Sequence, residues 1–211
     1  MKVNEIFQSI QGESTRAGLP CTFVRLTGCD LRCVYCDTAY AFHEGTRMTC
    51  TEVIAEVERL GCRFVTVTGG EPLLQEEVFG LMERLAEAGY DVQVETSGAA
   101  GIERVDRRVR IILDIKTPGS AMGHAMDWEN LSRLKPGDEV KLVLMGRGDY
   151  EWARDTLAAR PIPAGIPVLL SPVHGVLDPR DLAAWMQSDR LDARLQLQIH
   201  KYIWGPDVRG V

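Results

Sequence analysis

The stretch CTFVRLTGCDLRCVYCDT, residues 21–38, joins a run of apolar and β-branched residues to a loop with three cysteines. The first seven residues predict a β-strand, because β-branched and apolar side chains pack well on a pleated surface. Cys29, Cys33 and Cys36 then follow at a C-x3-C-x2-C spacing. Such a loop places three thiols close together at the end of a strand, where they can bind one inorganic group.

Six further segments of the same kind lie along the chain, at 63–68, 90–96, 109–116, 139–145, 166–171 and 194–200. Amphipathic helical patterns separate several of them. The alternation predicts a mostly parallel sheet, and about seven strands with fewer clear helices indicate an incomplete parallel β/α barrel. We expect one domain over residues 1–211.

The helical patterns carry recognisable ends. Residues 50–60 follow a capping box formed by Thr49 and Glu52 and stop at Gly61. Residues 76–89 and 149–159 are also expected to be helical. A further helix should begin at Pro179, with Asp178 as its N-cap.

Composition narrows the class of protein. The 211 residues are 45% hydrophobic and 26% charged, with a net charge of −6, which disfavours a general nucleic-acid surface. No apolar run reaches the roughly 20 residues that span a bilayer, and MKVNEIFQSIQGE lacks the apolar centre of a signal peptide. Six cysteines are too few for a disulfide scaffold of this size. We therefore expect a cytoplasmic protein with a small-molecule partner and no membrane segment.

The three clustered cysteines allow two interpretations. Structural zinc needs four ligands, so His43, Cys21 or Cys50 would have to supply the fourth, and the protein could then be a zinc-stabilised interaction module. An iron–sulfur cluster held by only three thiolates leaves one iron open to a ligand that is not protein. The short spacing and the turn permitted by Gly28 favour the cluster. A zinc module would also leave the segment GGEP, Gly69–Pro72, without a role.

The cysteine loop, with Tyr35 before its third cysteine, resembles the cluster loop of the radical S-adenosylmethionine superfamily. In that superfamily the open iron is bound by the amino and carboxylate groups of S-adenosylmethionine, and GGEP resembles the motif that binds its methionine part. The segments EIFQSIQGES, FVRLTGCDLRCVYCDT, TGGEPLL, VETSG, DIKTPGS and QIHKY resemble, in order, the 7-carboxy-7-deazaguanine synthases. This resemblance covers nearly the whole chain.

The resemblance implies a reaction and its cofactors. These enzymes are lyases of queuosine and 7-deazapurine biosynthesis that convert 6-carboxy-5,6,7,8-tetrahydropterin to 7-carboxy-7-deazaguanine with loss of ammonia. They use a [4Fe–4S] cluster, S-adenosylmethionine and Mg²⁺, an electron donor such as a flavodoxin or ferredoxin, and they form homodimers. A glycyl-radical activating enzyme is the alternative within the superfamily, but IQGE and Arg25 suit a small carboxylated substrate better than a protein.

The resemblance also implies roles for individual residues. No catalytic residue is expected beyond those that hold the cofactors and substrate. The expected cluster ligands are Cys29, Cys33 and Cys36, and Thr38 is the expected Mg²⁺ ligand. The expected S-adenosylmethionine contacts are Tyr35, Cys36, Asp37, Gly70, Glu71, Asp114, Lys116, Ser171 and His174. The expected substrate contacts are Ile10, Gln11, Gly12, Arg25, Thr68 and His200. After QIHKY the chain continues as IWGPDVRGV, which leaves open whether the Val211 carboxylate reaches the substrate, as it does in shorter family members.

Overall fold

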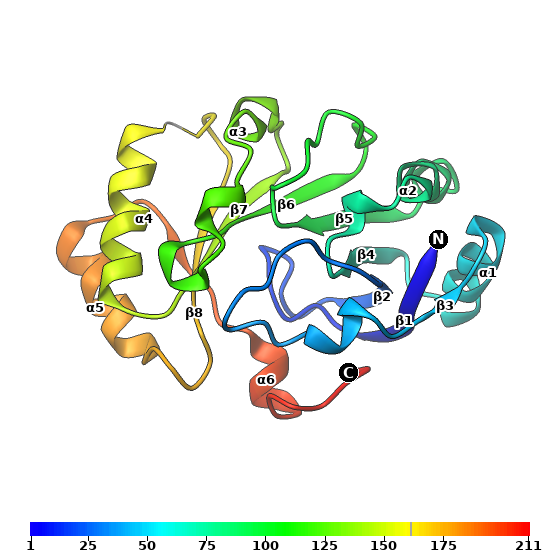
Figure 1. The fold of residues 1–211 in the computed structure, drawn as a ribbon, viewed down its shortest axis with the longest axis horizontal. Helices are drawn as coiled ribbons and strands as arrows, with labels where there is room; N and C mark the ends of the chain where they lie inside the picture. The colour runs from blue at the N-terminus through cyan, green and yellow to red at the C-terminus, as the bar shows by residue number, and fades with distance from the viewer. Residues whose placement is uncertain (161) are drawn as a thin grey trace.

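A computed structural model describes residues 1–160 and 162–211, and its described residues form one nine-stranded sheet in the order β3-β1-β2-β4-β5-β6-β7-β8-β9 (Figure 1). The strands are β1 Lys2–Ile10, β2 Pro20–Leu26, β3 Thr46–Arg47, β4 Phe64–Gly69, β5 Asp91–Thr96, β6 Arg110–Ile115, β7 Glu139–Leu144, β8 Val168–Pro172 and β9 Arg194–Leu195. From β2 through β9 neighbouring strands are parallel. Among the described residues the two edge strands, β3 and β9, do not pair with each other, which confirms the incomplete barrel.

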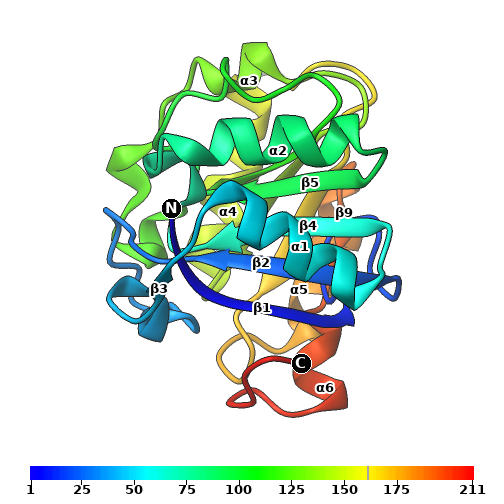
Figure 2. The same cartoon turned by 90° about the vertical axis from the view of Figure 1, so that its right-hand side faces the viewer.

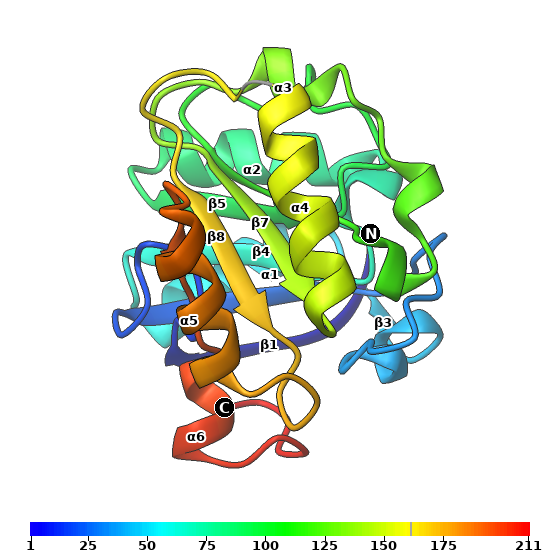
Figure 3. The ribbon, with the colours of Figure 1, turned by 90° about the vertical axis from the view of Figure 1, so that its left-hand side faces the viewer.

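The helices of the described residues are α1 Cys50–Leu60, α2 Glu77–Glu87, α3 Asn130–Arg133, α4 Arg147–Ala159, α5 Pro179–Asp189 and α6 Ile199–Ile203. The longer helices α1, α2, α4 and α5 lie on the outer face of this sheet, whereas the short α6 lies at the pocket on its concave side. Helices α1 and α2 cover the half of the sheet around β4 and β5 (Figure 2), whereas α4 and α5 cover β7 and β8 (Figure 3). None of the helices in the described residues has the length and apolar character needed to cross a membrane.

Two helix starts follow the predicted chemistry. The Thr49 hydroxyl accepts a hydrogen bond from the Glu52 backbone N–H, and the Glu52 carboxylate accepts one from the Thr49 N–H, which completes the capping box of α1. Gly61 ends that helix in the left-handed conformation, at φ 76°. Asp178 caps α5, and Pro179 occupies its first turn.

Two expectations about strands were incomplete or wrong. Strand β1 was not expected, and it pairs antiparallel with both β2 and β3. The expected strand 194–200 is only Arg194–Leu195, and the chain then turns into α6. Strand β9 pairs with β8 at Leu169 and Leu170, and the Gln196 N–H still donates to the Leu170 carbonyl at 2.9 Å, but the chain then leaves β8 and turns into α6.

Alternation along the parallel strands divides the sheet into an apolar and a polar face. Val65 and Val67 of β4 belong to the core under the helices, whereas Thr66 and Thr68 point to the concave side. The same alternation in the neighbouring strands gives the concave face a set of polar and charged side chains: Arg25, Glu95, Asp114 and Lys141. The concave face of the sheet is therefore polar and charged, whereas the face under the helices is apolar.

Candidate functional site

A pocket of about 620 Å³ occupies the concave side of the sheet and opens at the carboxyl ends of the strands. Four groups of residues form most of its walls: the cysteine loop with the residues after it (29–42), residues of β1 and β2, the strand ends of β4 to β7, and residues from segments 10–13 and 198–211. The position agrees with the rule that function gathers at the carboxyl ends of parallel strands. Segments from both ends of the sequence thus complete one site.

All three clustered cysteines line this pocket. The loop that carries them is held by local hydrogen bonds: the Gly28 N–H donates to the Ala41 carbonyl at 2.9 Å, and the Cys36 N–H donates to the Cys33 carbonyl at 3.1 Å. Within residues 1–160 and 162–211, no three His, Cys, Asp or Glu side chains converge tightly enough to hold a single metal ion. A cubane makes no such demand, because its thiolates bind different irons.

The GGEP segment packs directly against the cysteine loop. A Cβ added at Gly70 would lie 2.0 Å from the Gly28 carbonyl oxygen and 2.9 Å from the Cys29 Cβ. The Glu71 N–H also donates to the Gly28 carbonyl at 2.7 Å. Gly70 is therefore required for the close approach of two backbones that form the side of the pocket next to the cysteine loop.

Glu71 does not line the pocket, in contrast to its expected contact with S-adenosylmethionine. Its side chain is fully buried and accepts hydrogen bonds from Thr96, Ser97 and Leu73, at 2.6 to 3.0 Å. A carboxylate so completely hydrogen-bonded fixes the strand ends of β4 and β5 to one another. The Glu71 carboxylate therefore has hydrogen-bond partners inside the protein.

Two other expected residues also lie away from the pocket lining. Ser171 is 1% exposed, and its hydroxyl has no hydrogen-bond partner among the described residues. His174 lines a separate groove of about 150 Å³, where its ring meets Tyr202 edge-on with centroids 5.3 Å apart. Val173, between them in sequence, does reach the main pocket.

The remaining expected residues do line the pocket: Ile10, Gln11, Gly12, Arg25, Cys29, Cys33, Tyr35, Cys36, Asp37, Thr38, Thr68, Gly70, Asp114, Lys116 and His200. Arg25 donates through Nε to Glu5 at 2.7 Å, and the Tyr40 hydroxyl donates to the same carboxylate at 2.9 Å. This ion pair fixes the direction of the guanidinium at the wall.

A carboxylate that was not assigned from the sequence lies at the centre of the site. Glu95, in VETSG, accepts hydrogen bonds from the Thr68 hydroxyl at 3.0 Å and from Gln11 Nε2 at 3.4 Å. Burial raises the pKa of Glu95, and the nearby Lys141 ammonium opposes that rise. Gln11, Thr68 and Glu95 together offer both donors and acceptors to a ligand.

Lys141 is the other central residue that the sequence did not reveal. Its ammonium is 2.8 Å from a Glu13 oxygen and 3.2 Å from Asp114 Oδ2, and the same Asp114 oxygen is 3.1 Å from the Lys116 ammonium. A chain of alternating charge therefore crosses the pocket from Glu13 on the β1–β2 loop to Lys116 after β6. The sequence did contain a signal for Lys141, because it lies between apolar residues in the strand EVKLVLM and lysine is seldom buried without a partner.

These pairings set the protonation of the pocket. Burial alone would raise the pKa of Glu13, but the Lys141 ammonium and hydrogen bonds from Lys141 and Gln198 lower it to about 2. Burial lowers the pKa of Lys141, yet Glu13, Asp114 and Glu95 together raise it well above its usual value. The pocket thus keeps a fixed ammonium and ionised Glu13 at neutral pH.

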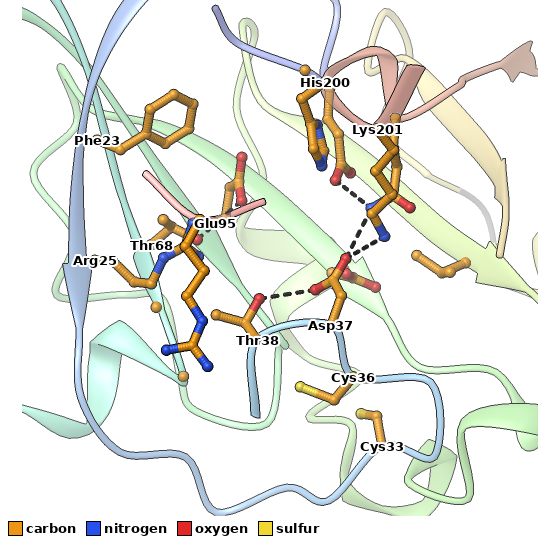
Figure 4. Close-up of a pocket in the computed structure, with 18 of the residues that line it drawn as sticks. Phe23, Arg25, Cys33, Cys36, Asp37, Thr38, Thr68, Glu95, His200 and Lys201 are labelled. Atoms are coloured by element: carbon orange, nitrogen blue, oxygen red, sulfur yellow. Dashed lines mark hydrogen bonds and ion pairs between the residues drawn. The ribbon is translucent and has the colours of Figure 1, made fainter. Parts of the chain in front are cut away.

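Figure 4 shows the short helix α6 reaching the cysteine loop. Lys201 forms an ion pair of 2.5 Å with Asp37, and the Thr38 hydroxyl donates to the other Asp37 oxygen at 2.8 Å. His200 lies against Gly12, where a Cβ would stand 1.9 Å from His200 Nδ1. Burial lowers the pKa of His200 below its ordinary value, despite the opposing charge of Glu13. The imidazole is therefore neutral at pH 7.

The sequence left open whether the C-terminal segment reaches the site, and in the structure all six residues of 206–211 line the pocket. Arg209 is 3.3 Å from a Glu44 oxygen, and its guanidinium lies 3.7 Å from the centre of the Tyr40 ring. Val211 is among the lining residues. The segment IWGPDVRGV thus returns to the pocket.

Comparison with known proteins places the chain in a family. The family model described as the radical SAM superfamily matches residues 23–159. A 7-carboxy-7-deazaguanine synthase of Koribacter versatilis (strain Ellin345) is 44% identical over the whole of both chains, and one of Chlorobaculum tepidum is 47% identical over 100% of this chain and 97% of its own. The crystal structure of QueE from Escherichia coli has the same fold, with a TM-score of 0.79 at 24% identity, and covers 93% of this chain and 92% of its own.

Proposed function

The chain belongs to the radical SAM superfamily and, within it, to the 7-carboxy-7-deazaguanine synthases, and we propose that it catalyses the ring contraction of 6-carboxy-5,6,7,8-tetrahydropterin to 7-carboxy-7-deazaguanine with loss of ammonia. One observation carries the proposal beyond the family: the three loop cysteines share a single pocket with Gln11 and Arg25. A group held by the cysteines and a small polar substrate held by the opposite wall would therefore lie within one cavity.

The residues present fit a [4Fe–4S] cluster and S-adenosylmethionine. Three thiols with no fourth in the lining leave one iron open, and Gly70 packs without a Cβ beside the loop that holds Cys29. Asp114 Oδ1 and the Tyr35 hydroxyl are buried without a partner among the described residues, so each can still serve a ligand. When bound, the cluster and S-adenosylmethionine supply the one-electron chemistry that begins the reaction.

The opposite wall fits a carboxylated pterin. The amino-pyrimidinone edge of a pterin carries adjacent N–H donors and a carbonyl acceptor, and Glu95 and Gln11 offer the complementary groups. The Arg25 guanidinium suits the substrate carboxylate because its planar fork can donate two parallel hydrogen bonds. Thr68 hydrogen-bonds to Glu95 and so orients that carboxylate.

The series of ion pairs from Glu13 to Lys116 is one way in which the protein's own side chains contribute to the chemistry. Glu13, Lys141 and Asp114 hold one another in place inside the barrel, so their charges need little reorganisation when a ligand arrives. The neutral imidazole of His200 can donate or accept one hydrogen bond at the substrate end. Helix α6 and segment 206–211 enclose the pocket and limit its access to water.

Thr38 fits the proposed Mg²⁺. Its hydroxyl proton points to Asp37, which leaves the oxygen lone pairs free for a cation. Mg²⁺ prefers oxygen ligands and keeps several waters, so one hydroxyl and the substrate carboxylate are sufficient anchors. We include in the proposal the carbon–nitrogen lyase class, an electron donor such as a flavodoxin or ferredoxin, and a homodimer.

The test is anaerobic turnover by the reconstituted protein. The protein is supplied with iron and sulfide, a reductant, S-adenosylmethionine, Mg²⁺ and 6-carboxytetrahydropterin, and the deazaguanine product is followed by mass. Cys33→Ala should abolish the product, whereas the matched control Cys50→Ala, a cysteine on α1 outside the pocket, should retain it. Cleavage of S-adenosylmethionine without deazaguanine under these conditions would refute the substrate, and failure to assemble any cluster would refute the cofactor.

A further inference from the structure

Helix α6 is joined to the cysteine loop by one short ion pair. Lys201 Nζ lies 2.5 Å from Asp37 Oδ2, although 164 residues separate the two in sequence. The Lys201 side chain is only 10% exposed, so the pair is shielded from water on the lysine side. The Asp37 side chain is 42% exposed, so the pair is shielded on the lysine side alone, and it links α6 to the cysteine loop.

Asp37 lies between two residues with expected roles in cofactor binding. Cys36 precedes it as an expected cluster ligand, and Thr38 follows it as the expected Mg²⁺ ligand. The two oxygens of Asp37 are divided between partners: Oδ2 faces Lys201, and Oδ1 accepts the Thr38 proton at 2.8 Å. Lys201 and the Thr38 hydroxyl are therefore linked through one carboxylate.

The helix that carries Lys201 is itself fixed to the substrate end of the pocket. The Ile199 N–H donates to the Gly12 carbonyl at 3.0 Å, and Gln198 Nε2 donates to Glu13 at 2.8 Å. The same Gln198 nitrogen is 3.4 Å from Asp37 Oδ2. Residues 198–201 thus connect the β1–β2 loop with the cysteine loop.

We propose that Lys201 is a positioning residue, which holds Cys36–Thr38 in the conformation that binds S-adenosylmethionine beside the cluster. Lys201 acts through Asp37. The inference rests on the proposed function, in that S-adenosylmethionine occupies the cluster side of the pocket. It adds that the binding of this cofactor depends on the C-terminal helix.

The test compares Lys201→Met, which keeps the apolar stem, with Lys201→Arg, which keeps the charge. Lys135→Met is the matched control, because Lys135 also forms a short ion pair, with Asp138, but outside the pocket lining. In each reconstituted protein the iron content, the Kd of S-adenosylmethionine by equilibrium dialysis, and the change that this ligand causes in the EPR spectrum of the reduced cluster are measured. None of these readouts requires the pterin.

Lys201→Met should assemble the cluster with wild-type iron content but bind S-adenosylmethionine about tenfold more weakly, the size expected for one positioning contact. The EPR change on ligand addition should be reduced, and Lys201→Arg should recover most of the affinity. A wild-type Kd and EPR change in Lys201→Met would overturn the proposal. If Lys201→Met does not fold, Lys201→Gln provides the same comparison. A wild-type protein that binds S-adenosylmethionine yet makes no deazaguanine would refute the substrate assignment alone.

Discussion

The imidazole of His200 packs so closely on the backbone of Gly12 that a Cβ at position 12 would lie 1.9 Å from Nδ1 and 2.7 Å from Cγ. These residues are 188 positions apart, and both line the pocket. The contact explains why a glycine occupies the centre of IQGE: it leaves room for a side chain from the other end of the chain. This contact and others in the pocket lead to measurable predictions.

Gly12→Ala should move the His200 ring out of place. The added methyl group costs about 1–3 kcal/mol of stability if the ring is displaced rather than the backbone. Misplacement of a substrate-binding group by about 1 Å can lower the rate about 100-fold, so kcat/KM for the pterin should fall by up to that factor. Steady-state kinetics after reconstitution measure the effect. Unchanged kcat/KM would show that His200 has no part in positioning the substrate.

Gly70→Ala should damage the cluster side of the pocket. Its new Cβ would lie 2.0 Å from the Gly28 carbonyl oxygen, which cannot rotate away as a side chain could. We expect a lower iron content after reconstitution and a loss of about 1–3 kcal/mol in the free energy of unfolding. Gly80→Ala is the control, because Gly80 lies in α2 with no atom within 4 Å of an added Cβ. That substitution should stabilise the protein by about 0.5–1 kcal/mol.

Lys141→Met should destabilise the fold by leaving Glu13 and Asp114 buried without their shared cation. Removal of one partner of a buried pair costs about 3–5 kcal/mol. Glu13→Gln combined with Lys141→Met should cost less than the sum of the single changes, because the uncompensated carboxylate is gone. Chemical denaturation of all four proteins measures the coupling. Additive changes would mean that the pair contributes no interaction energy.

His200 should make the free energy of unfolding decrease as the pH falls below about 6.5. Its folded-state pKa lies below the unfolded value of about 6.5, so the unfolded chain binds more protons in this range. The stabilising contribution is complete above about pH 6.5 and is lost as the pH falls below it. One proton gives a slope of at most about 1.4 kcal/mol per pH unit.

The measurement is the free energy of unfolding of the wild type minus that of His200→Gln across this range. The difference removes the contribution of Glu95, a buried carboxyl with a raised pKa that both proteins contain. His124→Gln, at an exposed histidine, is the matched control. A difference that does not change with pH would show that His200 titrates as it does in the unfolded chain.

The parallel part of the fold could be predicted from the sequence because its signals are local. Strand β4, for example, shows its alternation within its own residues, and helix α1 is preceded directly by its capping residue and followed directly by its terminating glycine. Strand β1 was missed since its sequence KVNEIFQSI mixes polar residues into a half-exposed strand that pairs antiparallel. The segment RLQLQIH has the alternation of a strand, but only two residues find a partner. Strand formation there depends on how far the segment stays beside β8, which the segment itself does not encode.

Part of the site could be predicted from the sequence, because the spacing of the three cysteines itself indicates the kind of group that they would bind. The pairing of Lys141 with Glu13 could not, because it joins residues 128 positions apart. A buried lysine signals that a partner exists, whereas only the fold identifies that partner. The hydrogen-bond partners of Glu71 could not be predicted from the sequence either. Its motif suggests a ligand contact, whereas in the structure its carboxylate accepts hydrogen bonds from neighbouring backbone N–H and hydroxyl groups.

The hydrogen bond from the Ile199 N–H to the Gly12 carbonyl joins a late segment of the chain to an early one, so this part of the pocket can form only after residue 199 has been synthesised. A chain leaving the ribosome has exposed all the residues of strands β1 to β8 before residues 198–211, which finish the pocket, have been synthesised. The sheet can therefore collapse around its apolar face early, while the charged interior still lacks Gln198 and Lys201. Until residues 198–211 have docked, the pocket therefore lacks the wall that Gln198, His200 and Lys201 form.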